Sequence, residues 1–375
     1  MPAGTVSVTE AATGADLRAF VHFPYDLYRA DSNWVPPLYR ESWAIVKGAG
    51  SQLLTSGPHV LFLARRDGAV AGRVAAGIDL KFNELKDRNE GYVTLFEADS
   101  ANTAGALLDR CCLWLQERGI ASVRGPISPT NGDDYRGVLV WGFEHPHTLL
   151  CAYNPPEYDG YFAGAGFSKY YDYYSYRFDA AQALPERYRQ VSDYAMRRYG
   201  FRVDTLDLAQ FDRDVADITA VMATATPEDW PDLTPPTLSE LRAAGEQLRP
   251  LAVPGLVLIA RYGAAPIGVG IGMPDYNQCL RRMGGRLFPW GWLKFLFGKR
   301  RITAGRFLVL FVVPEWQKRA VTGAIFVRML AAARRLGYTW GEGSTIGEFN
   351  LPMRREAEAA GGMHYKTHRV YRLEL

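Results

Sequence analysis

Two short apolar segments of the chain share one pattern. Residues 60–65 read Val-Leu-Phe-Leu-Ala-Arg, and residues 256–261 read Leu-Val-Leu-Ile-Ala-Arg. A continuous apolar run of about six residues that ends at turn residues is typical of a buried strand. Each run then passes through a glycine-containing turn and enters a second apolar stretch, at Gly72 in the first case and at Gly268 in the second. The pattern therefore predicts two similar β-hairpins, one in each half of the chain.

Each hairpin is followed by a predicted helix with one apolar face. Apolar residues recur there at the spacing that places side chains on one side of a helix. They are Leu107, Leu108, Cys111, Cys112 and Leu115 in the first half, and Ile325, Phe326, Met329, Leu330 and Ala333 in the second. A glycine follows each face, Gly119 or Gly337, and a glycine in this position commonly ends a helix.

Short motifs also match after the two helices. The pairs are Asn154-Pro-Pro with Asn350-Leu-Pro, and Gly166-Phe with Gly362-Met. Residues 148–153 and 344–349, which precede the two asparagines, have the composition of strands. Because glycines, asparagines and helix faces recur in one order, we interpret the chain as an internal duplication.

The order of elements predicts the fold class. Each half contains helices, a hairpin, and then strand, helix, strand, helix and strand, which indicates an α/β (α+β) fold with a mixed, mostly antiparallel sheet flanked by helices. The polar and alanine-rich segment 179–185 interrupts the strand-like pattern between the halves. We therefore predict two domains, residues 1–180 and residues 181–375.

Composition restricts the setting and the partners. The chain has 375 residues, of which 48% are hydrophobic and 22% charged, and its formal net charge is +3. This charge is too small to indicate nucleic-acid binding. The sequence shows neither a long apolar run that could span a membrane nor a secretory signal, so we expect a cytoplasmic protein. Its four cysteines lack metal-site spacing, so we expect no metal and no permanently bound cofactor.

A loop in the second half indicates a ligand. Residues 310–322 read Leu-Phe-Val-Val-Pro-Glu-Trp-Gln-Lys-Arg-Ala-Val-Thr. This stretch resembles the pyrophosphate loop of the GNAT (acyl-CoA N-acyltransferase) superfamily, in which a strand ends in Val-x-Pro and Gln/Arg-x-x-Gly-x-Gly/Ala opens a helix. The resemblance implies two tandem GNAT-like domains. It also implies that backbone N–H groups of the second domain bind acyl-CoA or acyl carrier protein as a co-substrate.

The residues that this resemblance assigns to the carrier are Val312, Val313, Gln317, Lys318, Arg319, Ala320, Thr322 and Asn350. Ala320 and Thr322 stand where the family usually has glycine or another very small residue. A solvated first turn of a helix is the alternative interpretation of the loop.

The first half keeps a different part of the GNAT pattern. Residues 154–167 resemble the motif Asn-x-x-Ala-x-x-x-Tyr-x-x-x-Gly-Phe, in which Tyr161 takes the position of the tyrosine that protonates the departing thiolate. A tyrosine packed on a helix is the alternative. The loop before the first helix contains Glu97 and Asp99, which would repel a phosphate, so we interpret that loop as degenerate.

A narrower resemblance covers nearly the whole chain. Segments 23–38, 124–126, 141–143 and 153–156 resemble a family of bacterial GNAT-like proteins that includes bacterial ceramide synthase. Residues 342–350 match that family's Glu-x-Ser-Trp-x-x-Glu-x-Asn segment except for a threonine in place of the tryptophan. The resemblance implies N-acylation of a long-chain amine, and the exchanged tryptophan leaves the choice of substrate open.

Two insertions distinguish the halves. Residues 286–301 mix Trp290, Trp292 and other apolar side chains with lysine and arginine. This mixture is typical of a segment that lies on a membrane surface or covers a lipid tail, and a core helix with a basic end is the alternative. The polar insertion 125–137 contains Asp133, Asp134 and Tyr135, which could line an acceptor pocket; an exposed loop is the alternative.

N-acylation requires a base for the amine and an acid for the leaving sulfur. The candidate bases are Glu342 and Glu348, then Glu97, and the candidate acids are Tyr365 and Tyr161. We add Tyr153 and Asn154 to the acceptor-binding candidates.

The first hypothesis is an N-acyltransferase that uses acyl-CoA or acyl carrier protein and acts on an amine, with a sphingoid base as the sharpest choice. The protein would be cytoplasmic, with attachment to the inner face of the cell membrane through residues 286–301 as a further hypothesis. The second is a catalytically silent GNAT-like module that binds a ligand or regulates a partner. An aminoacyl-tRNA-dependent transferase of tandem GNAT build is a weaker third, which the modest charge disfavours.

Overall fold

The computed structural model describes residues 5–48, 53–129, 131–182, 184 and 186–375. The chain forms two compact units. Unit 1 comprises residues 1–173, 277–300 and 366–375, and unit 2 comprises residues 174–276 and 301–365. These units follow spatial contacts rather than the repeat, so the predicted domain boundary at residue 180 stays a prediction.

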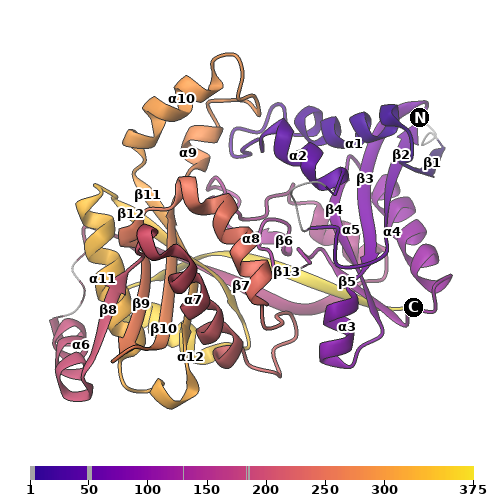
Figure 1. Ribbon diagram of the computed structural model, residues 1–375. Helices are drawn as coiled ribbons and strands as arrows, with labels where there is room; N and C mark the ends of the chain where they lie inside the picture. The colour runs from indigo at the N-terminus through magenta and orange to yellow at the C-terminus, as the bar shows by residue number, and fades with distance from the viewer. Residues whose placement is uncertain (1–4, 49–52, 130, 183, 185) are drawn as a thin grey trace. The chain divides into compact units, whose positions relative to one another are not determined.

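Unit 1 is built on a sheet with the strand order β1-β2-β3-β4-β5-β13, in which only β4 and β5 run parallel among the neighbours given in register (Figure 1). The short strand β6 also pairs with β13. The strands are β1 (Val6–Glu10), β2 (His59–Arg66), β3 (Ala69–Ile78), β4 (Glu90–Ala98), β5 (Ser122–Gly125), β6 (Val138–Trp141) and β13 (Met363–Glu374). The helices are α1 (Gly14–Leu27), α2 (Tyr39–Val46), α3 (Leu80–Lys86), α4 (Ala101–Gln116), α5 (Tyr158–Gly164), α9 (Asn277–Leu280) and α10 (Gly291–Gly298).

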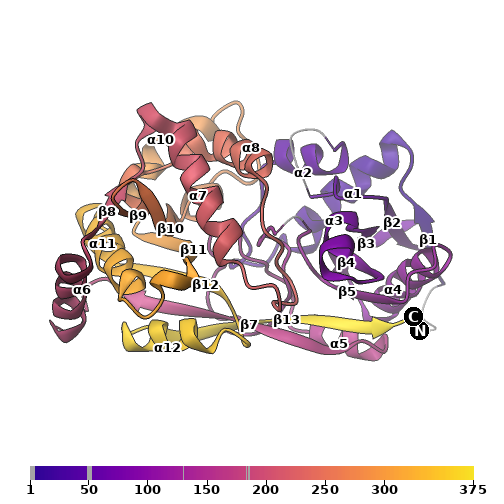
Figure 2. The same ribbon diagram turned by 60° about the horizontal axis from the view of Figure 1, so that its bottom comes forward.

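Unit 2 repeats this order with the strands β8-β9-β10-β11-β12-β7, and β11 and β12 are the parallel pair (Figure 2). Its strands are β8 (Phe201–Thr205), β9 (Val257–Tyr262), β10 (Ala265–Pro274), β11 (Ala304–Val312), β12 (Trp340–Gly347) and β7 (Ser168–Asp179). Its helices are α6 (Glu186–Tyr199), α7 (Phe211–Ala225), α8 (Leu238–Leu248), α11 (Val321–Arg335) and α12 (Leu351–Ala359).

The matching orders confirm the predicted fold class, but the last strand of each repeat belongs largely elsewhere than the sequence suggests. β13 ends the second repeat, yet residues 366–374 complete the sheet of unit 1 beside β5. β7 ends the first repeat, yet residues 174–179 belong to unit 2, where β7 lies beside β12. Each sheet therefore takes its last strand from the other repeat.

Alternating side chains of the central strands explain how both faces of each sheet are covered. In unit 2, Val269 of β10 packs with α7, and Gly270 faces α11. A Cβ atom at Gly270 would lie 2.4 Å from Ile325 Cγ2, so only glycine lets α11 approach this closely. Gly72 has the same role against α4 in unit 1, where a Cβ atom would lie 2.8 Å from Leu107 Cδ1.

The helices follow the predicted pattern. Most of the two predicted apolar faces is buried on α4 and α11, whereas Cys112, Leu330 and Ala333 are half-buried. Gly119 and Gly337 follow these helices with φ of 71° and 79°, as expected of glycines near a helix end.

One predicted strand is wrong. Residues 148–153 form no strand, and the segment that does pair with β13 is β6, ten residues earlier in the chain. Cys151 donates its N–H to the carbonyl of Thr148, and Leu150 has a left-handed φ of 59°. This turn breaks the extended conformation that the apolar composition suggests.

Candidate active site

Unit 1 contains a cavity of about 210 Å³. Its lining comes from α1, α2, β3, β4, α5, α9 and the segments 34–37, 134–138 and 147–154, together with Pro126. The register of β4 against β3 shifts between Arg73 and Ala75, and Leu95 has a φ of 53°. This β-bulge bends the end of β4, and bulges commonly re-aim side chains in this way.

Glu97 lies near the end of β4 and lines the cavity. Its Oε2 atom accepts hydrogen bonds from two phenols, Tyr28 Oη at 2.6 Å and Tyr158 Oη at 2.8 Å. Tyr158 Oη in turn accepts the backbone N–H of Ala98 at 2.9 Å, which fixes the direction in which the phenol donates. The carboxyl group of Glu97 is therefore held in one orientation at the cavity wall.

Burial raises the pKa of Glu97 to about 7, although the Arg73 guanidinium and the two phenols favour the ionised form. Arg73 stands opposite Glu97 on β3 and is 7% exposed. Its Nη1 donates to the carbonyl of Phe20 at 3.0 Å, and its Nε has no hydrogen-bond partner among the described residues. A carboxyl with a pKa near 7 can exchange a proton with a substrate at physiological pH.

Two further carboxyl groups line the same cavity, Glu41 of α2 and Asp134 of the polar insertion. Burial raises the pKa of each, and their mutual repulsion adds to this for Glu41. Tyr25 and Trp34 contribute aromatic rings to the wall, in an edge-to-face contact with centroids 5.5 Å apart. Carboxylates together with aromatic faces favour a cationic ligand over an anionic one.

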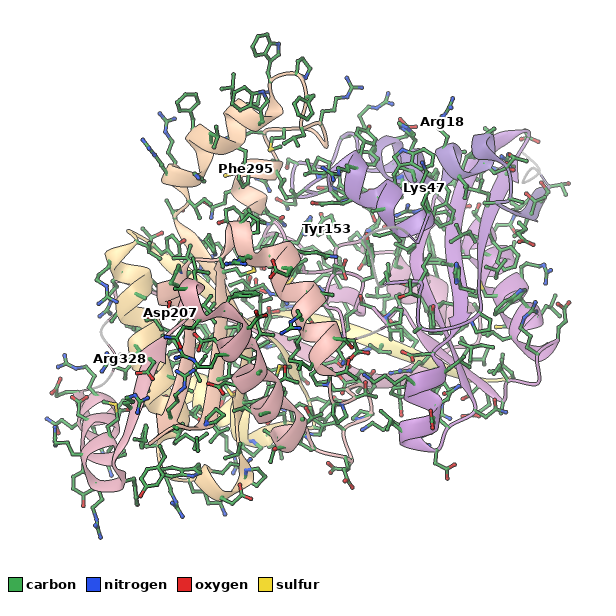
Figure 3. All side chains as sticks on the ribbon, viewed as in Figure 1. Arg18, Lys47, Tyr153, Asp207, Phe295 and Arg328 are labelled. Carbon is green, nitrogen blue, oxygen red and sulfur yellow. The ribbon has the colours of Figure 1, made fainter. Side chains whose placement is uncertain are left out.

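The structure brings several predicted acceptor residues to this cavity. Asp134, Tyr135, Tyr153 and Asn154 all line it. Tyr153, which is labelled in Figure 3, donates its hydroxyl to Asp31 at 2.7 Å.

Asn154 also has a structural role. Its side chain bonds to both the N–H and the carbonyl of Leu139, at 2.6 and 3.1 Å. These two bonds anchor the β6 backbone, so the asparagine shared by the two repeats is structurally engaged here.

Two other candidates of the first half lie outside the cavity lining. Asp133 is in an ion pair with Arg136 at 3.4 Å. Tyr161 is partly exposed on α5, one turn beyond Tyr158, and its ring lies 5.5 Å from that of Tyr158.

The predicted carrier loop of unit 2 has a distinctive backbone. Lys318 and Ala320 have left-handed φ values of 63° and 58°. Alternation of left-handed residues turns successive N–H groups to one side and creates a concave anion site. Helix α11 begins directly after Ala320 without a side-chain cap, and its first N–H groups carry partial positive charge.

The side chains of Lys318 and Arg319 add positive charge to this loop, and they are accessible to solvent. Gln317, Lys318 and Arg319 are exposed. Arg319 lies over the ring of Trp316, 4.9 Å from its centroid, and Gln317 Nε2 donates to the carbonyl of Val312 at 3.2 Å. The backbone N–H of Val313 donates to the carbonyl of Ile267 on β10 at 3.0 Å. Thr322 lies in the first turn of α11 and is half-buried.

The corresponding turn in unit 1 differs. Ser100 caps α4 by accepting the N–H of Thr103, and the neighbouring carboxylate of Asp99 is paired with Arg66. A capped helix end that carries a carboxylate is unsuited to a phosphate.

In unit 2, the position that corresponds to Glu97 is apolar. Val269 and Phe311 take the places of Arg73 and Glu97 in the β10–β11 register, and both pack in the apolar core beside α7. The two units therefore differ in their side chains, with a buried carboxyl of raised pKa in unit 1 and, in unit 2, a loop with left-handed residues before the uncapped start of α11.

The predicted catalytic residues Glu342 and Tyr365 meet in the core of unit 2. Tyr365 and Ser344 donate their hydroxyls to Glu342, and Arg306 Nε lies 3.9 Å from the same carboxylate. Both partners of this ion pair are fully buried. Such a network balances the cost of burying the two charges, and it lies where the parallel pairing of β11 and β12 ends.

The remaining candidates are dispersed. Glu348 follows the end of β12 and is half-buried, and Asn350 caps α12 by accepting the N–H of Met353 at 3.2 Å. Trp290 and Trp292 belong to unit 1 and are exposed at α10.

Sequence reasoning missed Tyr28, Arg73 and Tyr158. Tyr158 precedes Tyr161 by three residues, a spacing that places both on neighbouring positions of one helix, so the pattern alone could not choose between them. Arg73 follows Gly72 in the predicted second strand of the first hairpin. A lone arginine inside an otherwise apolar strand was the signal that could have identified it, because arginine is rarely buried unless its charge is paired.

Among the described residues, no helix is long and apolar enough to cross a membrane. A search of the same part of the chain finds no group of three or more histidine, cysteine, aspartate or glutamate side chains that could hold a metal ion.

Comparison with known proteins adds two relatives. Bacterial ceramide synthase of Caulobacter vibrioides is 28% identical over 381 residues, covering 99% of this chain and 98% of the relative. Protein YghO of Escherichia coli is 25% identical over 373 residues, covering 96% of this chain and 93% of the relative. No protein-family model matches the sequence.

Solved structures show the same fold. A tandem GNAT protein from the clavulanic acid biosynthesis pathway superposes with a TM-score of 0.57 at 10% identity, covering 99% of this chain and 98% of the other. A GCN5-related N-acetyltransferase from Sphaerobacter thermophilus gives a TM-score of 0.54 at 14% identity, covering 98% and 95%. The chain has the tandem GNAT fold, and its sequence resembles that of bacterial ceramide synthase, as the sequence patterns predicted.

Proposed function

We propose that this protein is an acyltransferase that moves an acyl group from a thioester of CoA or acyl carrier protein to an amine. The name of the Caulobacter relative and the tandem GNAT fold support this reaction class. The observation that carries the proposal is Glu97, a carboxyl group with a pKa of about 7 held by two phenols at a cavity wall.

In the proposed reaction, Glu97 is the base that accepts the proton of the amine. The amine nitrogen attacks the thioester carbonyl carbon, the carbon–sulfur bond breaks, and an amide forms. The proton that the nitrogen loses passes to Glu97, directly or through a water molecule, and the departing thiolate takes up a proton to leave as a thiol. A base whose pKa lies near the working pH performs this transfer best.

The amine is proposed to bind in the unit 1 cavity. Its carboxyl groups and aromatic walls would attract an ammonium group, which becomes a nucleophile only after losing a proton. A long-chain amine such as a sphingoid base, giving a ceramide, is the narrower proposal. Its support is the 28% identity to bacterial ceramide synthase.

The thioester carrier is proposed to bind at the unit 2 loop. The left-handed Lys318 and Ala320, the uncapped start of α11 and the exposed Lys318 and Arg319 suit a pyrophosphate or a phosphopantetheine phosphate. This assignment follows the general preference of anions for such N–H groups.

A thiol-release assay tests the proposal. Purified protein would receive acyl-CoA or acyl carrier protein with sphinganine or with small amines, and CoA binding would be followed by calorimetry. Glu97→Gln should lower the rate strongly. The matched control is Glu84→Gln on α3, because Glu84 is exposed and does not line the cavity. Absence of carrier binding and of thiol release with every substrate would refute the proposal that this protein is an acyltransferase.

A further inference from the structure

The segment 286–301 exposes apolar side chains that soluble proteins usually bury. Phe288 is 73% exposed, Trp290 is 68% exposed and Phe297 is 69% exposed. Trp292 and Leu296 are exposed as well. Single exposed apolar residues need no explanation, but a contiguous group marks an interaction surface. We call residues 286–301 the aromatic-basic segment.

The backbone of the segment explains why these side chains face outward. Helix α10 packs through its glycines, since a Cβ atom at Gly298 would lie 3.0 Å from Cys279 Sγ, and one at Gly291 would lie 1.9 Å from the carbonyl of Arg286. At these two positions the inner side of α10 is therefore too tight for a side chain. Lys294 Nζ donates to the carbonyl of Arg282 at 3.1 Å and ties the helix to the preceding turn.

The charged side chains in and around this segment, which lies in unit 1 except for Arg301, are all positive. Residues 277–301 include no aspartate and no glutamate. The seven cations are Arg281, Arg282, Arg286, Lys294, Lys299, Arg300 and Arg301, and all of them are exposed. Because the net charge of the whole chain is only +3, this positive charge is concentrated rather than general.

Tryptophan beside lysine and arginine is the composition of segments that rest at the boundary between lipid headgroups and acyl chains. The eight residues of α10 are too few to span a bilayer, which requires about 20 residues in a helix. The segment can therefore lie on a membrane but cannot cross it. Figure 3 shows α10 with Phe295 and the surrounding side chains.

We propose that the aromatic-basic segment docks this protein on a bilayer that contains anionic phospholipid. Phe288, Trp290 and Phe297 enter the interface, and the surrounding arginines and lysines contact the headgroup phosphates. The docking does not depend on the acyl transfer proposed above, although a membrane site would bring the enzyme to a lipid acceptor. An acidic protein partner or a second copy of this chain is the competing occupant.

Vesicle flotation of the purified full-length protein tests the docking. The protein is mixed with vesicles of phosphatidylcholine alone or with phosphatidylglycerol added, at low and at high salt. We expect binding to the anionic vesicles, little binding to the neutral ones, and weaker binding at high salt because exposed charges are screened. Absence of binding to anionic vesicles at low salt would overturn the proposal.

Two pairs of variants locate the surface. Trp290→Ser/Trp292→Ser should reduce binding about tenfold or more, because two interfacial anchors are lost, whereas Tyr194→Ser, which alters a 58% exposed ring on α6, should not change it. Lys299→Glu/Arg300→Glu should abolish the preference for anionic lipid. Arg197→Glu/Arg198→Glu, which makes the same change of charge on α6, should leave that preference intact.

Equal flotation of a variant and its control would refute the assignment to this segment. Size-exclusion chromatography decides between the occupants. A dimer that dissociates in Trp290→Ser/Trp292→Ser, together with no vesicle binding by the wild type, would assign the surface to self-association and overturn the membrane proposal. Because all the changed side chains are exposed, thermal unfolding should be unchanged in every variant.

Discussion

Replacement of Glu97 by glutamine separates the electrostatic role of this carboxyl from its packing. Glutamine has nearly the same shape, and its Oε1 atom can still accept hydrogen bonds from Tyr28 and Tyr158. What the variant loses is the ability to ionise. Any change in the pH dependence of stability or rate therefore reports on the charge of Glu97.

The magnitude follows from the pKa. Burial raises the pKa of Glu97 from the usual 4.5 to about 7, so the ionised carboxyl costs the folded protein about 3 kcal/mol, at about 1.4 kcal/mol for each tenfold change in proton affinity. Between pH 4.5 and pH 7 the folded protein holds a proton that the unfolded chain has released. Stability due to this group is therefore complete below pH 4.5 and declines as the pH rises to about 7.

Glu97→Gln should remove that decline. In denaturant unfolding, the difference in stability between variant and wild type should grow in favour of the variant by up to about 3 kcal/mol from pH 4.5 to pH 8. In thiol-release assays, the wild-type rate should rise with pH through a midpoint near 7 as the base ionises. The variant should lose this limb and about 10²- to 10⁴-fold in rate. The Glu84→Gln control should change neither property.

Two results would refute the reasoning. If Glu97→Gln kept the rising limb near pH 7 at the wild-type rate, another group would be the base. If the stability difference did not change with pH, the carboxyl would not be buried as the structure shows.

Three further predictions use single side chains. Tyr158→Phe should remove one donor to Glu97 and move the rising limb of the rate to higher pH, whereas Tyr161→Phe should leave that limb unchanged; pH–rate profiles of the pair check this. Ala320→Gly should stabilise the carrier loop by up to about 1 kcal/mol and Ala320→Val should destabilise it, because φ is left-handed there; calorimetric CoA affinity should follow the same order. Gly270→Ala should cost about 1–3 kcal/mol by overpacking against Ile325, measured by denaturant unfolding, and unaltered stability would contradict the close approach of α11.

The candidate site was only partly predictable. The loop at Lys318 was a candidate because pyrophosphate loops have a local sequence pattern, and the structure gives Lys318 and Ala320 left-handed φ values there. That the loop binds an anion stays a prediction. Glu97 was a candidate but stood after Glu342, since both are acids at predicted strand ends and sequence alone shows no burial or partners. In the structure Glu342 is fully buried beside Arg306 and lines a smaller, mainly apolar pocket, whereas Glu97 lines the cavity of about 210 Å³ together with other carboxyl groups.

The sequence by itself determined the features that depend on neighbouring residues. The two hairpins, the apolar faces of α4 and α11 and the glycines after them recur in both halves, because periodicity and turn chemistry act over a few residues. The duplication followed from that recurrence, and the resemblance of residues 310–322 and 154–167 to GNAT motifs implied the tandem GNAT fold.

Only the tertiary structure decided which distant segments meet. β13 completes the sheet of unit 1 beside β5, although it ends the second repeat. Arg73, Tyr28 and Tyr158 converge on Glu97 from three separate elements. Strand pairing and burial depend on contacts between residues far apart in sequence, and this burial raises the pKa of Glu97 to about 7, although the arginine and the two phenols oppose the shift. The local sequence pattern predicts the helices, strands and turns, whereas packing between segments far apart in sequence sets the pKa of the Glu97 carboxyl.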